Sequence, residues 1–322
     1  MYRKADMSRW QGRIDEAEGL GGRRWHQIVQ VFDPDTAGSS GNGKGVALIG
    51  FACDAGVARN HGRTGAAEGP AAIRAMLGNM PVRRRTVIVD AGDVACVDDA
   101  LEDAQQELSA HLAELLDAGY LPLAMGGGHE IAFGSFGGLA RHLEKKEGKP
   151  RIGVINLDAH FDLRQAERAS SGTPFRQIAE DCAARGWPFS YCCLGISEFA
   201  NTQALFERAR QLGVRWMLDE DMSAARFDAV RAQVEAFLSE VDHVYFTICL
   251  DVLPAGVAPG VSAPAARGVP LDVVEPIADL IAVSGKLRLA DIAELNPGRD
   301  IDQRTARVAA RLLARLAERT GT

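Results

Sequence analysis

Short apolar runs alternate with longer amphipathic stretches along most of this chain. Eight runs rich in apolar and β-branched residues predict strands, and the stretches between them carry apolar residues at helical spacing. The predicted strands are Val46–Ala52, Thr86–Asp90, Leu121–Met125, Ile152–Leu157, Ser190–Gly195, Val214–Leu218, Val244–Leu250 and Leu287–Ile292. The predicted helices are Pro70–Leu77, Asp99–Asp117, His129–Lys145, Thr202–Leu212, Ser223–Glu240, Leu271–Val283 and Asp302–Arg319. Strands separated by helices favour an α/β fold with three αβα layers and a mainly parallel eight-stranded sheet.

The first 45 residues lack this alternation. They predict an irregular N-terminal arm, and the glycine-rich stretch Asp33–Gly45 predicts a loop that leads into the first strand. No internal repeat or second domain is evident, so residues 46–322 are expected to form one α/β domain.

Polar residues with metal-binding chemistry directly follow one of the predicted strands. The segment Asp158-Ala159-His160-Phe161-Asp162 comes after Ile152–Leu157. If the backbone stays extended there, Asp158, His160 and Asp162 point to the same side of the strand end. Two carboxylates and an imidazole on one side indicate a metal site or an acid–base site. A solvated strand edge with a satisfied histidine is the alternative for this segment alone.

Two further strands end in similar chemistry. Gly126-Gly127-Gly128-His129 follows Leu121–Met125, and the glycines allow a tight turn and close backbone approach. Cys249 and Asp251, two residues apart, end the run Val244–Leu250. Each piece alone could be turn or cap chemistry. Because open α/β sheets place their sites at the carboxyl ends of parallel strands, the three pieces together predict a shared metal centre.

The order G-G-x-H, D-A-H-x-D and a late C-x-D resembles the ureohydrolase (arginase/agmatinase) superfamily. The resemblance runs from about Val46 to Pro297. Four further stretches resemble the formimidoylglutamases of histidine degradation: Trp10–Asp15, Gly56–Ala66, Ser171–Phe175 and Val261–Pro264. The resemblance implies an arginase-like fold, with residues 46–322 as a ureohydrolase-like catalytic domain. It also implies a metal-dependent hydrolase that converts N-formimidoyl-L-glutamate to L-glutamate and formamide.

The resemblance further implies two Mn²⁺ ions per subunit. His129, Asp158, Asp162 and the position of Cys249 would hold one ion, and Asp158, His160, Cys249 and Asp251 would hold the other. Asp162 would also have a catalytic role, as the acceptor of a hydrogen bond from the activated water. Paired divalent ions make hydroxide available near neutral pH.

Cys249 departs from the superfamily pattern, which has a bridging aspartate at this position. A thiolate offers one soft sulfur where Mn²⁺ prefers hard oxygens. Several readings stay open: weaker Mn²⁺ binding, a softer ion, a half-filled site, or a variant with impaired catalysis.

The resemblance also assigns a substrate pocket. Glu294, in Asp291–Pro297, matches the catalytic carboxylate that holds the amidine or guanidinium of the substrate, which suits charge pairing. Arg164 lies where an additional substrate carboxylate would be bound, because its planar fork pairs bidentately. Asn60, Ser171, Gly172 and Thr173 are expected to line the same pocket. Phe175 stands near a position at which arginases carry a histidine, which argues against an arginase proper. A guanidino-acid ureohydrolase that releases urea, or a silent relative, remains an alternative.

The composition limits the classes of partner that this chain is expected to bind. The chain has 322 residues and a net charge of −7, which gives no general electrostatic footprint for nucleic acid. No apolar stretch approaches the length of a membrane span, and the first residues are polar, without a secretory h-region. Six cysteines without zinc-ribbon or scaffold spacing suit reduced thiols. We therefore expect a cytoplasmic enzyme that acts on a small-molecule substrate, binds neither nucleic acid nor membrane, and forms a homo-oligomer.

Overall fold

The computed structural model describes residues 1–34, 45–84 and 86–320. Within these residues a sheet of ten strands runs through the molecule in the order β1-β4-β3-β5-β10-β9-β6-β7-β8, and β2 also pairs with β4. All pairs are parallel except β1 with β4. The strands are β1 Tyr2–Arg3, β2 Gln30–Val31, β3 Val46–Ala52, β4 Ile88–Ala95, β5 Leu121–Met125, β6 Ile152–Leu157, β7 Ser190–Ile196, β8 Arg215–Leu218, β9 His243–Cys249 and β10 Leu287–Ala293. The predicted mainly parallel α/β sheet is therefore confirmed, with two short strands added.

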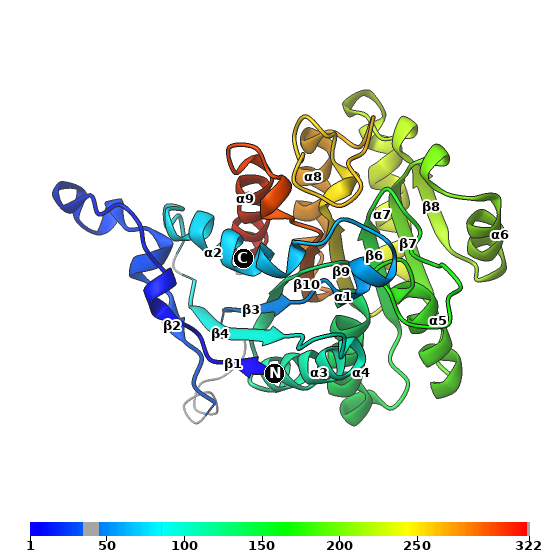
Figure 1. Cartoon of the computed structure of the whole chain (residues 1–322), viewed down its shortest axis with the longest axis horizontal. Coiled ribbons are helices and arrows are strands. Elements are labelled where there is room, and N and C mark those ends of the chain that lie inside the picture. The colour runs from blue at the N-terminus through cyan, green and yellow to red at the C-terminus, as the bar shows by residue number, and fades with distance from the viewer. Residues whose placement is uncertain (35–44, 85, 321–322) are drawn as a thin grey trace.

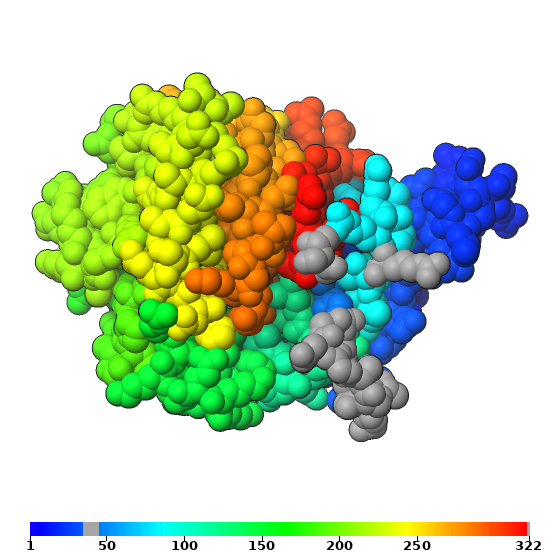
Figure 2. Space-filling model, turned by 180° about the vertical axis from the view of Figure 1, so that it is seen from behind, coloured from blue at the N-terminus to red at the C-terminus, as the bar shows by residue number. Residues whose placement is uncertain are grey.

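Helices cover both faces of the sheet (Figure 1). One face carries α2 Gly69–Gly78, α7 Phe227–Glu240, α8 Leu271–Ala282 and α9 Arg304–Arg319. The other carries α3 Leu101–Asp117, α4 Ile131–Glu147, α5 Pro174–Arg185 and α6 Gln203–Gln211. Each face has its own apolar cluster, and the residues of β3, β6 and β7 alternate between the two. Figure 2, seen from behind, shows α8 in orange beside the red C-terminal end. The three-layer prediction is confirmed.

Two helices were not foreseen. The short α1, Ala55–Arg59, follows β3, and α5 follows the loop after β6. In α5, Phe175, Ile178, Ala179 and Cys182 are buried at helical spacing. The other predicted elements differ from the observed ones mainly at their ends, where caps and turns decide the boundary.

The N-terminal segment packs against the sheet edge at several points. β1 and β2 pair with β4 on its outer side, and Trp10 donates from Nε1 to Oδ2 of Asp90 at 2.8 Å. A blue part of this segment, away from β1, projects from the body in both views (Figures 1 and 2). Most of the predicted loop Asp33–Gly45 lies outside the described residues. No helix in the described part of the chain has the length and apolar character that crossing a bilayer requires.

Candidate active site

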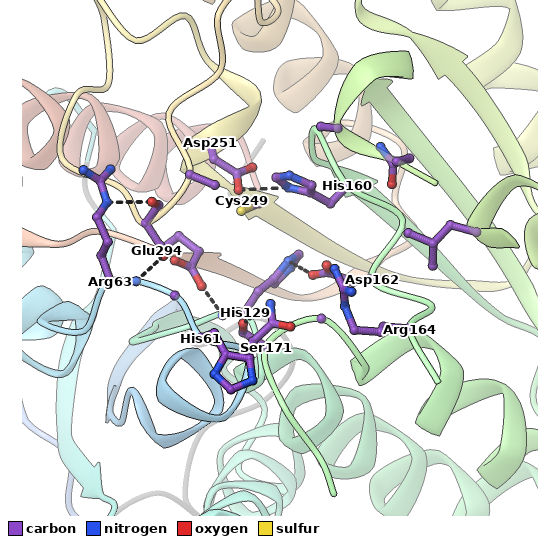
Figure 3. A pocket seen from close by; sticks show the side chains of 18 residues that line it. His61, Arg63, His129, His160, Asp162, Arg164, Ser171, Cys249, Asp251 and Glu294 are labelled. Atoms are coloured by element: carbon purple, nitrogen blue, oxygen red, sulfur yellow. Dashed lines mark hydrogen bonds and ion pairs between the residues drawn. The ribbon is translucent and has the colours of Figure 1, made fainter. Parts of the chain in front are cut away.

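Four central strands bring the predicted site residues to one edge of the sheet. The strands β5, β10, β9 and β6 are neighbours, and their last residues lie close in register: Ile292 of β10 pairs with Met125 and Ile248, and Ile248 pairs with Leu157. Because all four run parallel, the segments that follow them meet at the same edge. His129, Cys249 and Glu294, labelled in Figure 3, come from three of these strand ends, and Asp158 comes from the fourth.

The glycine turn after β5 fits between two neighbouring strand ends. A Cβ at Gly127 would lie 1.6 Å from the carbonyl oxygen of Cys53, so only glycine fits. This close approach lets Gly128 donate to the carbonyl oxygen of Cys53 and Glu294 donate to that of Gly127. The turn therefore connects β3, β5 and β10 and places His129 at the centre of the edge.

His129 has one ring nitrogen facing the protein core and one facing carboxylates. Its Nε2 lies 3.0 Å from Oγ1 of Thr247, a contact that fixes the orientation of the ring. Its Nδ1 lies 2.9 Å from an oxygen of Asp158 and 2.9 Å from an oxygen of Asp162. The residue is 1% exposed.

The segment after β6 reaches the same centre by a different path from the one expected. The backbone does not stay extended; it bends at Ala159 and His160, and Asp162 adopts a left-handed φ of 48°. His160 nevertheless lies with Nδ1 3.2 Å from Asp251 and 3.5 Å from Asp158. The expected convergence therefore comes from a turn whose strained residue is an aspartate, one of the few types that tolerate this region.

Two groups of potential metal ligands result from these contacts. His129, Asp158 and Cys249 form one, and Asp158, His160 and Asp251 form the other, with the ligand atoms in each group within 4.8 Å of one another. Asp158 belongs to both groups. In this structure Asp162 is not in either group, although it contacts His129.

The chemistry of these residues fits a pair of cations. Nδ1 of His129 and Oδ1 of Asp251 are buried and satisfy no hydrogen-bond geometry among the described residues. Nδ1 of His129 nevertheless faces two carboxylates at 2.9 Å. Buried polar atoms without partners are costly, and positive ions between the carboxylates and imidazoles would satisfy them.

Burial and mutual repulsion perturb the titration of this edge. Burial and the charge of Asp158 raise the pKa of Asp162 to about 6. Burial together with nearby carboxylates raises the pKa of Glu294 to about 8. Burial lowers the pKa of His129, but Asp158 and Asp162 outweigh it and hold the pKa well above the ordinary value. An excess of acidic groups in a buried site is the environment that attracts cations.

Cys249 is the last residue of β9, and its side chain is buried. Burial raises the pKa of its thiol well above the ordinary value, and the charges of Asp158, Asp251 and Glu294 raise it further. In these surroundings the thiol keeps its proton unless a cation is bound beside it.

Glu294 follows β10 in a left-handed conformation with φ of 72°. Its Oε1 accepts a hydrogen bond from the backbone N–H of His129 at 3.0 Å. Its Oε2 is buried and has no hydrogen-bond partner among the described residues. Glu294 also lines the pocket, so a strained backbone and an oriented carboxylate present one oxygen for a ligand.

A pocket of about 340 Å³ opens above the two ligand groups. Arg164, Ser171 and most of the predicted metal ligands line it (Figure 3). Asn60 and Gly172 line it as well. Nδ2 of Asn60 donates to Oγ of Ser171 at 3.2 Å. A Cβ on Gly172 would lie 3.2 Å from both Nε of Arg164 and the amide of Asn60, so the glycine keeps these two side chains close together.

Thr173 is placed differently from the other predicted pocket residues. It does not line the pocket and is fully buried. Its Oγ1 accepts from the backbone N–H of Ser170 at 2.9 Å and lies 2.8 Å from Gln177. The structure thus gives Thr173 a place in the loop before α5 instead of a contact with the pocket.

Several lining residues were not among the predicted site residues. They are His61, Gly62, Arg63, Ala200, Asn201, Leu205, Ser262 and Ala263. The motif stretches Gly56–Ala66 and Val261–Pro264 contained five of them, but sequence alone does not show that these stretches meet. They meet because Arg63 donates to the carbonyl oxygens of Ser262 and Val261 at 2.8 and 2.6 Å.

The three-layer fold and the groups of potential metal ligands at the strand ends define an α/β protein with a candidate metal centre. The sequence model of the arginase family matches residues 44–318, so this chain belongs to the arginase family.

Two similar members of the family are formimidoylglutamases. A formimidoylglutamase of Ralstonia nicotianae is 66% identical over 319 residues, which cover 99% of this chain and 97% of the relative. A formimidoylglutamase of Aeromonas hydrophila is 55% identical and covers 98% of each chain.

Solved structures agree on the fold. The formimidoylglutamase of Bacillus subtilis is 22% identical with a TM-score of 0.78 and covers 93% of this chain and 92% of its own. The formiminoglutamase of Trypanosoma cruzi, whose structure contains Mn²⁺, is 25% identical with a TM-score of 0.76. The match covers 91% of this chain and 99% of the relative.

Proposed function

We propose that this chain hydrolyses N-formimidoyl-L-glutamate to L-glutamate and formamide, a reaction of histidine degradation. It is a hydrolase that acts on the C–N bond of a linear amidine. The observation that carries the proposal is one pocket that joins two acid–imidazole ligand groups and Glu294 at its base to Arg164 at its rim. The 66% identity to a formimidoylglutamase supports the same reaction.

Mn²⁺ is the proposed metal, with two ions per subunit. His129, Asp158 and Cys249 would hold one ion, and Asp158, His160 and Asp251 the other. Asp162, which lies 2.9 Å from His129, is proposed as a further ligand. The Mn²⁺ of the Trypanosoma cruzi relative supports this choice. Two bound divalent ions would supply a hydroxide near neutral pH.

The residues around the amidine have separate roles in this proposal. The free Oε2 of Glu294 accepts an N–H of the cationic amidine and holds the formimidoyl carbon toward the ligand groups. Asp162 accepts a hydrogen bond from the attacking water and orients it. The water oxygen bonds to the formimidoyl carbon, the bond from that carbon to the glutamate nitrogen breaks, and the nitrogen leaves with a proton as the amine.

The rim of the pocket selects a substrate that carries carboxylates. Arg164 is exposed, and its guanidinium has no carboxylate partner in the described part of the chain. Asn60, Ser171 and the open space at Gly172 lie beside it. An unpaired guanidinium with amide and hydroxyl donors beside it suits bidentate recognition of a carboxylate. Arginine and agmatine lack the second carboxylate that would use it.

The test compares substrates on the Mn²⁺-loaded protein. We expect N-formimidoyl-L-glutamate to be turned over faster than arginine, agmatine or a guanidino acid, with formamide as the product. Formamide and urea are measured separately, and protein treated with a chelator is the blank. Equal or faster turnover of a cationic substrate with one carboxylate or none, or release of urea, would contradict the proposal.

Two further expectations belong to the same proposal. A homo-oligomer is supported by large apolar side chains at the surface: Phe199 is 99% exposed and Leu20 is 70% exposed. A cytoplasmic location is supported by six free cysteines, which suit a reducing compartment. Light scattering and cell fractionation test them, and a monomer at working concentration would remove the first.

A further inference from the structure

The loop between β6 and α5 carries the rim of the pocket. Residues 163–173, named here the rim loop, contain Arg164, Ser171 and Gly172, and they form neither helix nor strand. The backbone N–H of Arg164 donates to the carbonyl oxygen of Gly172 at 2.9 Å, which closes the base of the loop. The part between has few backbone partners of its own. Its conformation must therefore be fixed by contacts from other elements.

Three arginines from three different helices supply such contacts. Arg59, the last residue of α1, donates from Nη1 to the carbonyl oxygen of Ala169 at 3.0 Å. Arg176 of α5 donates from Nε to the carbonyl oxygen of Arg164 at 3.0 Å. Arg208 of α6 donates from Nη1 to the carbonyl oxygen of Leu163 at 2.7 Å. All three bonds end on the main chain of the rim loop.

Two of the three arginines are themselves held by carboxylates outside the rim loop. Arg59 is the most constrained, because Asp99 and Glu102 at the start of α3 bind it at 2.7 Å each and only 9% of its side chain is exposed. Arg176 pairs with Glu180 one helical turn further along α5. Arg208 also contacts Oε1 of Gln165, within the rim loop, at 3.4 Å. Arg59 and Arg176 are thus oriented by pairs that do not involve the substrate.

Fixing the loop in advance lowers the entropy lost when a ligand is bound. Two of the three carbonyls, those of Leu163 and Arg164, lie at the residue whose guanidinium faces the pocket or directly before it. These two hydrogen bonds therefore act on the backbone that carries Arg164, and not on the fold in general.

We propose that Arg59, Arg176 and Arg208 are positioning residues that hold the rim loop so that Arg164 and Ser171 meet a carboxylate of the substrate. The inference rests on the proposed function. It adds a residue set that acts on substrate affinity through Arg164, without contact with the ligand groups.

The first experiment separates KM from kcat. We expect Arg208→Ala and Arg59→Ala to raise KM for N-formimidoyl-L-glutamate about 5- to 20-fold, with kcat within about twofold and bound metal unchanged, since one charged hydrogen bond is lost. Arg59→Lys, which keeps the charge and one donor, should fall between wild type and Arg59→Ala. Arg151→Ala is the matched control, because it removes an exposed pair with Asp242 at the opposite end of β6.

The second experiment repeats Arg208→Ala in an Arg164→Ala background. If Arg208 acts by positioning Arg164, its removal there should change KM by less than about twofold. The same factor in both backgrounds would overturn the inference, as would a fall in kcat and metal content with KM unchanged. If Arg59→Ala does not fold, the inference is still tested by Arg59→Lys and by Arg208→Ala in the wild-type and Arg164→Ala backgrounds. If the wild-type protein releases no formamide, the proposed function itself is wrong. This outcome is distinct from a failure of the positioning inference alone.

Discussion

Replacing Cys249 by aspartate should strengthen Mn²⁺ binding. The thiol is buried beside Asp158, Asp251 and Glu294, and its pKa lies well above the ordinary 9.0. Deprotonating a thiol of pKa 9.0 at pH 7 costs about 2.7 kcal/mol, and the buried one costs more. A bound Mn²⁺ must supply this free energy before the sulfur can act as a ligand.

An aspartate in place of Cys249 costs less to ionise. The buried carboxyls nearby, Asp162 and Glu294, have pKa values of about 6 and about 8. A carboxyl with a pKa in this range at position 249 would need roughly 0–1.4 kcal/mol to ionise at pH 7. The difference of at least about 1.3 kcal/mol predicts roughly tenfold tighter Mn²⁺ binding. The preference of Mn²⁺ for oxygen over sulfur acts in the same direction.

The assay is a titration of chelator-treated protein with Mn²⁺, with free ion measured by electron paramagnetic resonance. Cys249→Asp should bind more tightly and, without metal, should melt at a lower temperature because it adds a carboxyl to an acidic cluster. Cys192→Ala controls for loss of a buried thiol, since Cys192 lies in the apolar core. If wild type already binds two ions as tightly as the variant, and Cys249→Ala binds no worse, position 249 is not a ligand and the reasoning fails.

Three other predictions follow from the site. Arg164→Ala should raise KM about 10- to 150-fold by loss of roughly 1.5–3 kcal/mol, while Arg164→Lys retains part of the affinity; unchanged kinetics would make Arg164 a surface residue. Metal analysis should show about one ion lost in His129→Ala and about two in Asp158→Ala, and equal stoichiometry would contradict the two groups. Folding raises the pKa of Glu294 from 4.5 to about 8, so the metal-free folded protein binds the extra proton and loses stability as pH rises through this range. Glu294→Gln should flatten that slope in thermal unfolding.

The fold was predictable where hydrophobic pattern alone decides the element. β4 was predicted too short because Asp90 and Asp93 interrupt its apolar run, and neither charge reveals its partner in sequence. In the structure Arg74 of α2 binds them at 2.8 and 2.6 Å, and the strand continues to Ala95. β1 and β2 have two residues each, too few to show a period, and exist only because β4 is there to pair with them.

The meeting of the site residues was predictable where they lie at a strand end or a few residues beyond it. His129, Asp158 and Cys249 needed only the rule that parallel strands end at one edge. The turn that places Asp162 depends on a left-handed backbone that no pattern specifies. Arg63 and Ser262 meet across 199 positions of sequence, and only the folded path of both loops brings them together.

The ligand groups lie at strand ends and the pocket rim lies on loops, so substitutions at the two places should alter metal binding and substrate choice separately. The ligand groups rest on the ends of β5, β6 and β9, whose register is fixed by neighbours on both sides. The residues proposed to face the substrate carboxylates lie after α1 and in the rim loop, residues 163–173, which contain none of the proposed ligands. Within such a fold, loop substitutions should change substrate choice at constant metal binding. Cys249 is different, because it is the last residue of a central strand and belongs to one of the ligand groups. A substitution of Cys249 should therefore change which metal is bound and how tightly, and not which amidine is hydrolysed.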